Sequence, residues 1–139
     1  MNKPERISVR KAMRDDVTFI DGRKNVLDAL RAMRDGQCTS LVVEKRDDHD
    51  EYGILTLSDI AKHVIAKDRA PERVHVFEIM SKPTISVHPT MDIRYCARLF
   101  RKFGIRRAPV IEDHQVGVHQ AVGDAPGFTC LLFLLQLVD

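Results

Sequence analysis

A chain of 139 residues is long enough for one ordinary domain or two very small lobes. Hydrophobic residues make up 44% and charged residues 30% of it, which is typical of a soluble globular protein and argues against disorder as its dominant state. The 22 basic and 20 acidic residues leave a net charge of only +2, so the sequence lacks the strong basic field of a dedicated nucleic-acid binder.

The N-terminal residues and the cysteines indicate the cellular compartment of the protein. The opening residues, MNKPERISVRKAM, contain no continuous apolar run of the kind found in a signal peptide. The three cysteines are odd in number and form no CxxC motif, which disfavours a disulfide framework and a structural zinc site. The six histidines are scattered, and we expect no metal site. These features predict a cytoplasmic protein.

The first half of the chain begins with a short apolar segment, VTFID, followed by a helix. The apolar residues of that helix follow the i, i+3, i+4, i+7 spacing of a single buried face. They are Val26, Ala29, Leu30 and Met33. This spacing predicts one amphipathic helix packed against a sheet.

Two strands and a second helix follow in the same half. The run SLVVE has the composition of a buried strand, and YGILTL predicts the next one. Between them, the charged run from Lys45 to Glu51 predicts a solvated hairpin loop. A helix is expected from about Ser58 to Lys67, and the segment DRAPERVH, with Pro71 as helix breaker, predicts a linker.

The second half repeats this pattern at a constant offset, which places Met80 on Met13. The apolar positions of the first helix then become Ile93, Cys96, Ala97 and Phe100, with the same spacing. We infer an internal duplication with the order strand, helix, strand, strand, helix in each copy. The predicted fold is α/β, in the broad sense that includes α+β. Neither copy alone buries much core, so we expect two pseudo-symmetric units packed sheet to sheet, with a cleft between them.

The stretch GILTLSD joins the second strand of the first copy to its last helix. Thr56 and Ser58 are good N-cap residues, and Asp59 in the first turn favours the positive end of the helix dipole. The same groups also suit a ligand. A helix N-terminus with hydroxyl donors favours a phosphate, and an aspartate accepts two hydrogen bonds from a ribose diol. The two roles are compatible.

The duplicated unit, together with GILTLSD and GIRRAPVIED, resembles a tandem pair of CBS domains, named for cystathionine beta-synthase. The two stretches fit the family patterns G-h-h-[ST]-x-x-D and G-[VI]-x-x-x-P-V, and the resemblance extends from about Val9 to Val116. It implies paired units with a cleft that binds adenosine-containing ligands: AMP, ADP, ATP, S-adenosylmethionine and, in some members, dinucleotides. No obligatory cofactor is implied.

The resemblance also implies roles for residues of the first copy. Asp59 would hold the ribose hydroxyls, Thr56 would face the phosphate with Ser58 beside it, and Leu55 would pack near the base. Thr39 holds the position in this copy that Arg106 holds in the other.

From the second copy, the resemblance places Thr84 and Ile85 against the adenine and Arg106 near the phosphate. Ordinary strand packing would explain Thr84 and Ile85 equally well. A solvated pair after a helix would explain Arg106 and Arg107, and Arg107 is the weaker candidate of the two.

The second copy breaks the pattern near its end. Gly117 matches Gly53, but Gln120 stands where a Thr or Ser belongs and Gly123 where Asp belongs. Pro126 and Gly127 then interrupt the expected last helix. We therefore expect one principal ligand site per chain.

These observations set the predicted boundaries: a first CBS unit with its N-terminal segment at 1–69, the core of a second unit at 70–117, and an atypical apolar tail at 118–139. Without a regular last strand, the edge of the sheet at APVIE would stay open and invite pairing. We expect the tail from Leu131 to Val138 to cover that edge.

The resulting functional prediction is a stand-alone regulatory module that senses an adenosine nucleotide and signals through an unidentified partner protein or through self-association. We expect a homodimer, formed through the helix that carries Ala61, Val64 and Ile65. No nucleophile-elbow, P-loop or HExxH motif is present, so we expect no enzyme. The nearly all-apolar stretch from Phe128 to Val138 has eleven residues, too few to span a membrane.

The alternative is a nucleic-acid binder that uses basic residues clustered around the second copy's helix. They are Arg98, Arg101, Lys102, Arg106 and Arg107. A solvated helix face would also explain them.

Overall fold

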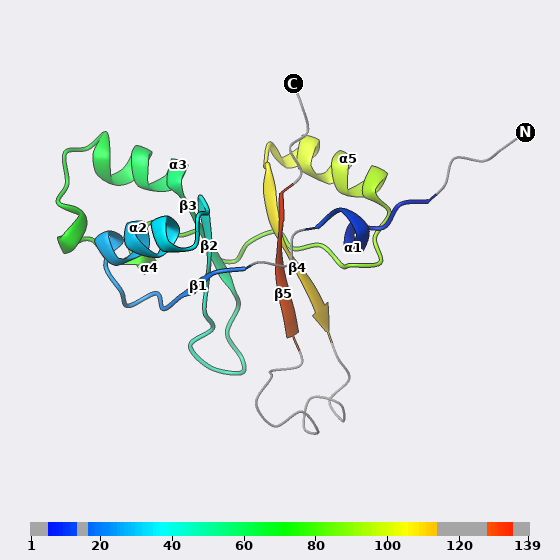
Figure 1. The fold of residues 1–139 in the computed structure, drawn as a ribbon, viewed down its shortest axis with the longest axis horizontal. Coiled ribbons are helices and arrows are strands. Elements are labelled where there is room, and N and C mark those ends of the chain that lie inside the picture. The colour runs from blue at the N-terminus through cyan, green and yellow to red at the C-terminus, as the bar shows by residue number, and fades with distance from the viewer. Residues whose placement is uncertain (1–5, 14–16, 114–127, 135–139) are drawn as a thin grey trace, which may run out of the picture. The chain divides into compact units, whose positions relative to one another are not determined.

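The structure is a computed structural model that describes residues 6–13, 17–113 and 128–134. The chain forms two compact units, one of Val17–Thr84 and one of Met1–Asp16 together with Ile85–Asp139 (Figure 1). The N-terminal segment thus groups with the second half of the chain, whereas the sequence analysis placed it with the first. The predicted break around Gln120, Gly123, Pro126 and Gly127 lies outside the described residues.

The unit Val17–Thr84 has a three-stranded sheet in the order β1-β2-β3, with β1 parallel and β3 antiparallel to β2. Its elements are β1 (Phe19–Ile20), α2 (Val26–Asp35), β2 (Ser40–Val43), β3 (Gly53–Thr56), α3 (Leu57–Ile60), the π-helix η1 (Ala61–Ile65), the 3-10 helix η2 (Pro71–Arg73) and α4 (Val76–Ile79). The predicted strand, helix, strand, strand, helix order of the first copy is confirmed, and its last helix ends two residues before the predicted end.

The other unit repeats part of this arrangement. Its described elements are α1 (Val9–Ala12), α5 (Ile93–Phe103), β4 (Arg107–Asp113) and β5 (Phe128–Leu134). The predicted first strand, TISVH, is reduced to a single parallel bridge between Val87 and Val110. Pro83 and Pro89 flank this segment, and prolines disfavour a continuous ladder because they lack a backbone N–H.

The C-terminal segment covers the edge at APVIE, as predicted, but it does so as a regular strand, which the sequence analysis did not expect in the second copy. β5 pairs antiparallel along the whole of β4, from Arg107 opposite Leu134 to Asp113 opposite Phe128. Such pairing satisfies backbone groups that an open edge would expose. The prediction is therefore confirmed for Leu131–Leu134, and the residues after them lie outside the described part of the chain.

The internal duplication is confirmed at the offset expected from the sequence. α1 and α4 begin at Val9 and Val76, and α2 and α5 begin the same distance apart along the chain. The two long helices also share their N-cap position. Asn25 accepts a hydrogen bond from the backbone of α2, and Asp92 accepts one from the backbone of α5.

The first helix of each copy packs in the unit that contains the other copy's long helix. In one unit, the Val76 N–H donates to the Lys24 carbonyl at 2.9 Å, and the Val26 N–H donates to the Val74 carbonyl at 2.8 Å. The Val9 N–H makes the equivalent bond to the Met91 carbonyl at 2.8 Å in the other unit. Figure 1 shows α4 near α2 and α1 near α5. The two copies thus exchange their opening helices.

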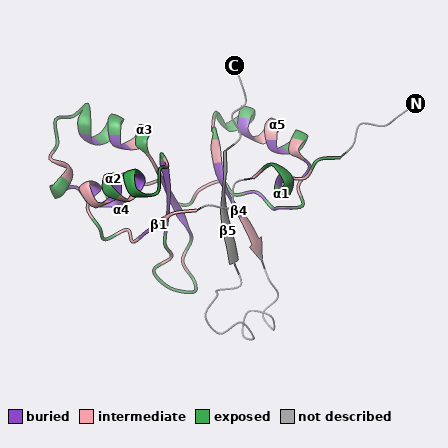
Figure 2. Ribbon diagram, viewed as in Figure 1, coloured by how far each residue is buried: buried purple, intermediate pink, exposed green. Residues whose placement is uncertain are grey.

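Each unit has its own hydrophobic core, which includes the exchanged helix (Figure 2). Val76 is fully buried in one core and Val9 in the other. The buried members of the first core are Ile20, Val26, Ala29, Met33, Leu41, Val43, Leu55, Ile60, Val64, Val74, Val76 and Ile79. Those of the second are Val9, Val87, Cys96, Phe100, Ala108 and Val110.

The apolar stripe expected for dimerisation divides between the core and the surface. Val64 is fully buried in its own unit, whereas Ala61 is exposed and Ile65 is 59% exposed. η1 is wider than an α-helix, so successive residues turn through a smaller angle and the stripe changes direction. Of the three residues of the predicted stripe, Ala61 and Ile65 are exposed and can contact another molecule.

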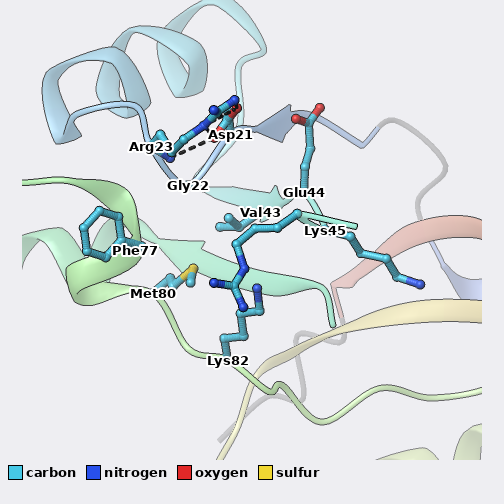
Figure 3. Close-up of a pocket in the computed structure, with 10 residues that line it drawn as sticks. Asp21, Gly22, Arg23, Val43, Glu44, Lys45, Phe77, Met80 and Lys82 are labelled. Atoms are coloured by element: carbon cyan, nitrogen blue, oxygen red, sulfur yellow. Dashed lines mark hydrogen bonds and ion pairs between the residues drawn. The ribbon is translucent and has the colours of Figure 1, made fainter. Parts of the chain in front are cut away.

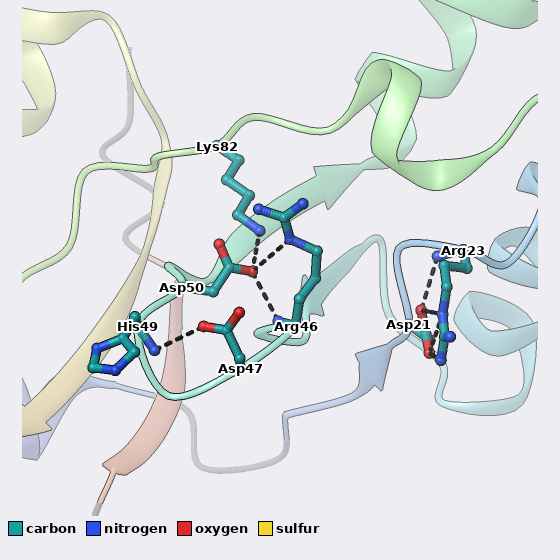
Figure 4. Close-up of polar contacts among 7 residues, drawn as sticks. All are labelled: Asp21, Arg23, Arg46, Asp47, His49, Asp50 and Lys82. Carbon is teal, nitrogen blue, oxygen red and sulfur yellow. Dashed lines mark hydrogen bonds and ion pairs between the residues drawn. The ribbon is translucent and has the colours of Figure 1, made fainter.

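The charged run from Lys45 to Glu51 forms the loop between β2 and β3, as predicted, but it is not fully solvated. The Asp50 side chain is only 8% exposed. It accepts hydrogen bonds from the Lys82 ammonium and from the backbone N–H and Nε of Arg46 (Figure 4). These bonds hold the pKa of Asp50 well below its usual range. They tie the loop to the segment after α4.

Replacing Asp50 by asparagine should lower the free energy of unfolding at neutral pH, because the charged partner of Lys82 is lost. The pKa of Asp50 is lowered in the fold, so its contribution is present above the ordinary value of 3.8 and is lost as the pH falls through the lower, folded value. The urea midpoints of wild type and variant should therefore differ at neutral pH and converge in acid. Asp48→Asn, on an exposed loop residue, should show no such convergence.

Candidate functional site

The predicted junction lies where β3 ends and α3 begins. The Thr56 hydroxyl accepts a hydrogen bond from the Asp59 N–H at 3.1 Å, and the Thr56 N–H donates to Asp59 Oδ2 at 3.0 Å. These reciprocal bonds form a capping box, so the predicted capping role is confirmed. Such a cap stabilises the fold by about 1 kcal/mol.

The capping box leaves polar atoms at the junction unused. Asp59 is half-buried, and its Oδ1 accepts no hydrogen bond within the described parts of the chain. A carboxylate accepts bonds at both oxygens, so one oxygen serves the cap while the other remains for a ligand hydroxyl. Ser58 lies in the same first turn of α3 and is exposed. The geometry is thus compatible with a cap that also binds.

Thr39 lies beside this junction. Its carbonyl accepts a hydrogen bond from the Leu57 N–H at 2.9 Å, and the next residue, Ser40, is paired with Thr56. The Thr39 residue is exposed, as a ligand contact requires. The structure therefore brings together four of the predicted site residues from two chain segments. They are Thr39, Thr56, Ser58 and Asp59.

Leu55 differs from the sequence-based expectation. Its side chain is fully buried in the core of the unit, because it faces away from the surface on a strand that is covered by helices. A buried leucine is not free to pack against a ligand base. Leu55 instead holds β3, and with it Thr56, in place.

A shallow hollow of about 310 Å³ adjoins Thr39. It is lined by Leu30, Met33, Arg34, Gln37, Cys38, Thr39 and Leu57. Leu57 is 43% exposed, and the sequence analysis did not single it out because one leucine after a threonine reads as an ordinary helix residue. The hollow offers an apolar wall next to the junction, the role expected of Leu55.

The remaining predicted residues lie elsewhere in the chain. Thr84 is half-buried at the end of its unit, whereas half-buried Ile85 and exposed Arg106 belong to the other unit. The Val17–Thr84 unit therefore contains some of the predicted site residues, and the other unit contains Ile85 and Arg106.

Among the described residues, the second copy has no counterpart of the junction's threonine. Arg107 pairs with Leu134, in the same register in which Ser40 pairs with Thr56. A leucine thus takes the strand position of the threonine. The sequence analysis assigned the position equivalent to Thr56 to Gln120, whereas the strand pairing assigns it to Leu134. Both assignments leave the second copy without the hydroxyl.

The basic residues of the nucleic-acid alternative lie mainly on α5. The Arg98 guanidinium lies 5.4 Å from the Tyr95 ring centre, and the Lys102 ammonium 5.7 Å from that of Phe103. Arg101 and Arg106 are exposed, and Arg107 begins β4. Exposed cations resting on neighbouring rings are common on helix surfaces. They do not by themselves favour nucleic acid.

Among the described residues, no helix has the length and apolar character needed to cross a bilayer.

Comparison with known proteins identifies the family. The CBS domain model matches residues 9–66 and 76–118. The second match ends where the sequence pattern breaks, next to Gly117. An uncharacterised protein of Methanopyrus kandleri is 29% identical over 108 residues, which cover 78% of this chain and 55% of that protein. The chain therefore spans about half the length of this relative.

Solved structures agree with this result. A hexameric CBS-CP12 protein from bloom-forming cyanobacteria is 34% identical, with a TM-score of 0.78, over 96% of this chain and 69% of its own. A CBS domain protein of Pyrobaculum aerophilum, complexed with AMP, is 16% identical, with a TM-score of 0.67, over 77% and 80%. The CBS domain pair of MJ0100, complexed with 5'-methylthioadenosine and S-adenosylmethionine, is 22% identical, with a TM-score of 0.65, over 77% and 85%. The two long helices, the repeated offset and the matched segments lead to one assignment: the chain belongs to the CBS domain family.

Proposed function

We propose that this protein is a regulatory module that binds one adenosine-containing nucleotide, namely AMP, ADP, ATP or S-adenosylmethionine. The observation that carries the proposal is the Thr56–Asp59 junction, where a capping box leaves one carboxylate oxygen unused. The complexes of the Pyrobaculum protein with AMP and of MJ0100 with S-adenosylmethionine support this ligand class. The matched family gives no reason to assign a catalytic reaction.

In this proposal, Asp59 accepts hydrogen bonds from the ribose hydroxyls, and the hydroxyls of Thr56, Ser58 and Thr39 serve the phosphate end. Leu57 supplies an apolar wall in place of Leu55.

The remaining ligand contacts come from the other half of the chain. Thr84 and Ile85 hold the base, and Arg106 neutralises the phosphate. The predicted boundaries, 1–69 for the first unit, 70–117 for the second and 118–139 for the tail, assign these three residues to the second unit.

We further propose that two chains form a homodimer, with exposed Ala61 and Ile65 at the contact, and that the nucleotide controls a partner protein or the dimer itself. Light scattering at micromolar concentration tests the dimer, and a monomer would contradict it.

A thermal-shift panel tests the ligand class. AMP, ADP, ATP, S-adenosylmethionine and NAD should be compared with guanosine and cytidine nucleotides. At least one adenosine compound should raise the melting temperature, because a ligand that binds only the folded state stabilises it. Calorimetry should then give one site per chain, since Leu134 replaces Thr56 in the second copy. Equal shifts with all bases, or two equivalent sites, would contradict the proposal.

A further inference from the structure

A second cavity lies in the Val17–Thr84 unit, away from the Thr56 junction. Its volume is about 650 Å³, within the range of small-molecule sites. It is lined by Asp21, Gly22, Arg23, Val43, Glu44, Lys45, Arg46, Phe77, Met80 and Lys82 (Figure 3). The junction adjoins Ser40 at the start of β2, whereas the cavity adjoins Val43 at its end. The two sites are about 10 Å of strand apart.

Part of the cavity lining is apolar. Val43 is buried at its base, and the side chains of Phe77 and Met80 come from α4 and the residue after it (Figure 3). Phe77 is 53% exposed, and one face of its ring stacks on His75 with 5.3 Å between ring centres. An exposed phenyl ring at the wall of a cavity favours a flat apolar group as its neighbour.

A group of paired charges lies at the other side of the cavity. Asp50 holds both Lys82 and the Nε of Arg46 (Figure 4). The Lys82 side chain is only 15% exposed, so this pair is not a pair of freely solvated ions. The lowered pKa of Asp50 keeps its carboxylate charged, and the three groups together carry one net positive charge.

Arg46 is the cation best placed to receive a ligand. Its backbone N–H and its Nε are bonded to Asp50, while its two terminal amino groups make no hydrogen bond to the residues that the structure describes. A guanidinium held at Nε keeps its stem in place and presents the remaining donors as a fork that suits a carboxylate or phosphate. Arg23 differs, because one of its terminal amino groups donates to Asp21 at 2.8 Å.

The duplicated copy provides an internal comparison. The offset that places Met80 on Met13 also places Phe77 on Arg10 and Glu112 on Lys45. The Arg10 and Glu112 side chains form an ion pair of 3.1 Å. The unit that contains α5 thus has a closed salt bridge where the Val17–Thr84 unit has an exposed ring and a cation. Among the described residues, the combination of ring, cavity and cations is found in the Val17–Thr84 unit alone.

We propose that this cavity binds a small organic anion in which an anionic oxygen group, phosphate or carboxylate, is joined to a flat aromatic ring. The anionic group lies on the Arg46 fork, next to Lys82, and the ring lies against Phe77 and Met80. This site is separate from the nucleotide site proposed at Asp59 and does not depend on it.

The test is a titration of the full chain, followed by amide chemical shifts in NMR spectra. Phenyl phosphate and phenylacetate are the probes, and inorganic phosphate and benzyl alcohol are the controls that lack one half of the ligand. Saturable shifts should be confined to the amides of Gly22, Lys45 and Phe77 and their neighbours. Whichever probe binds more tightly identifies the anionic group.

Variants then locate the site. Arg46→Gln should weaken binding of the better probe by about tenfold, the effect of one charge-assisted hydrogen bond. Phe77→Ala should weaken it by several-fold. Arg98→Gln, which removes an exposed cation stacked on Tyr95, should change nothing, and Asp59→Ala should leave probe binding intact. Scattered or unsaturable shifts, or probe affinity unchanged in both Arg46→Gln and Phe77→Ala, would overturn the proposal, whatever the outcome at the nucleotide site.

Discussion

Replacing Asp59 by alanine should weaken binding of the adenosine ligand by about 10- to 100-fold, because the variant loses charge-assisted hydrogen bonds to the ribose. Calorimetry with the best ligand of the thermal-shift panel measures this change directly. The same substitution also removes half of the capping box, since Asp59 Oδ2 accepts the Thr56 N–H at 3.0 Å. Its effect on stability, about 1 kcal/mol, must be separated from its effect on binding.

Two matched variants make that separation. Asn25→Ala removes the N-cap of α2 in the same unit, where the side chain accepts the Asp28 N–H at 2.8 Å. It should lower stability by a similar amount and leave affinity unchanged. Asp59→Asn keeps an oxygen for the Thr56 N–H and removes only the charge, so it should lose affinity with little loss of stability. If Asp59→Ala binds the nucleotide as tightly as wild type, Asp59 is only a cap and the proposed site is wrong.

The parts of this fold that follow local rules were predictable from the sequence. The apolar positions of the first long helix have a 3.6-residue period, and the same period appears again in the second copy. The cap at Thr56 was predictable because a threonine followed three residues later by an aspartate satisfies the backbone locally. Neither inference required knowledge of distant contacts.

Features that depend on tertiary contacts were not predictable. α1 and α4 have only four residues each, too few to show a helical period, and their partners lie in the other copy. Asp50 was expected in solvent because it lies in a charged run, and only the fold brings Lys82, 32 residues away, to it. The second cavity draws its lining from three separate segments, so no short motif indicated it.

The exchange of opening helices leads to the prediction with the largest effect on stability. Val9→Asp should destabilise the unit that contains α5, although Val9 comes from the start of the first copy. Val9 is fully buried between residues of the second copy, and its replacement puts an unpaired charge among Cys96, Phe100 and Val110. A buried charge without a partner costs about 3–5 kcal/mol.

Hydrogen exchange followed by mass spectrometry identifies the unit that is affected. In Val9→Asp, the amides of α5 and β4 should exchange faster while those of β2 and β3 stay protected. Val76→Asp should give the opposite profile, because Val76 is fully buried in the core formed by α2, β2 and β3. Ile7→Asp is the control, since this side chain is 45% exposed next to the same helix and should change neither profile. If both buried variants speed exchange equally across the two units, the chain unfolds as a single cooperative body, and the exchanged helices do not define separate units of stability.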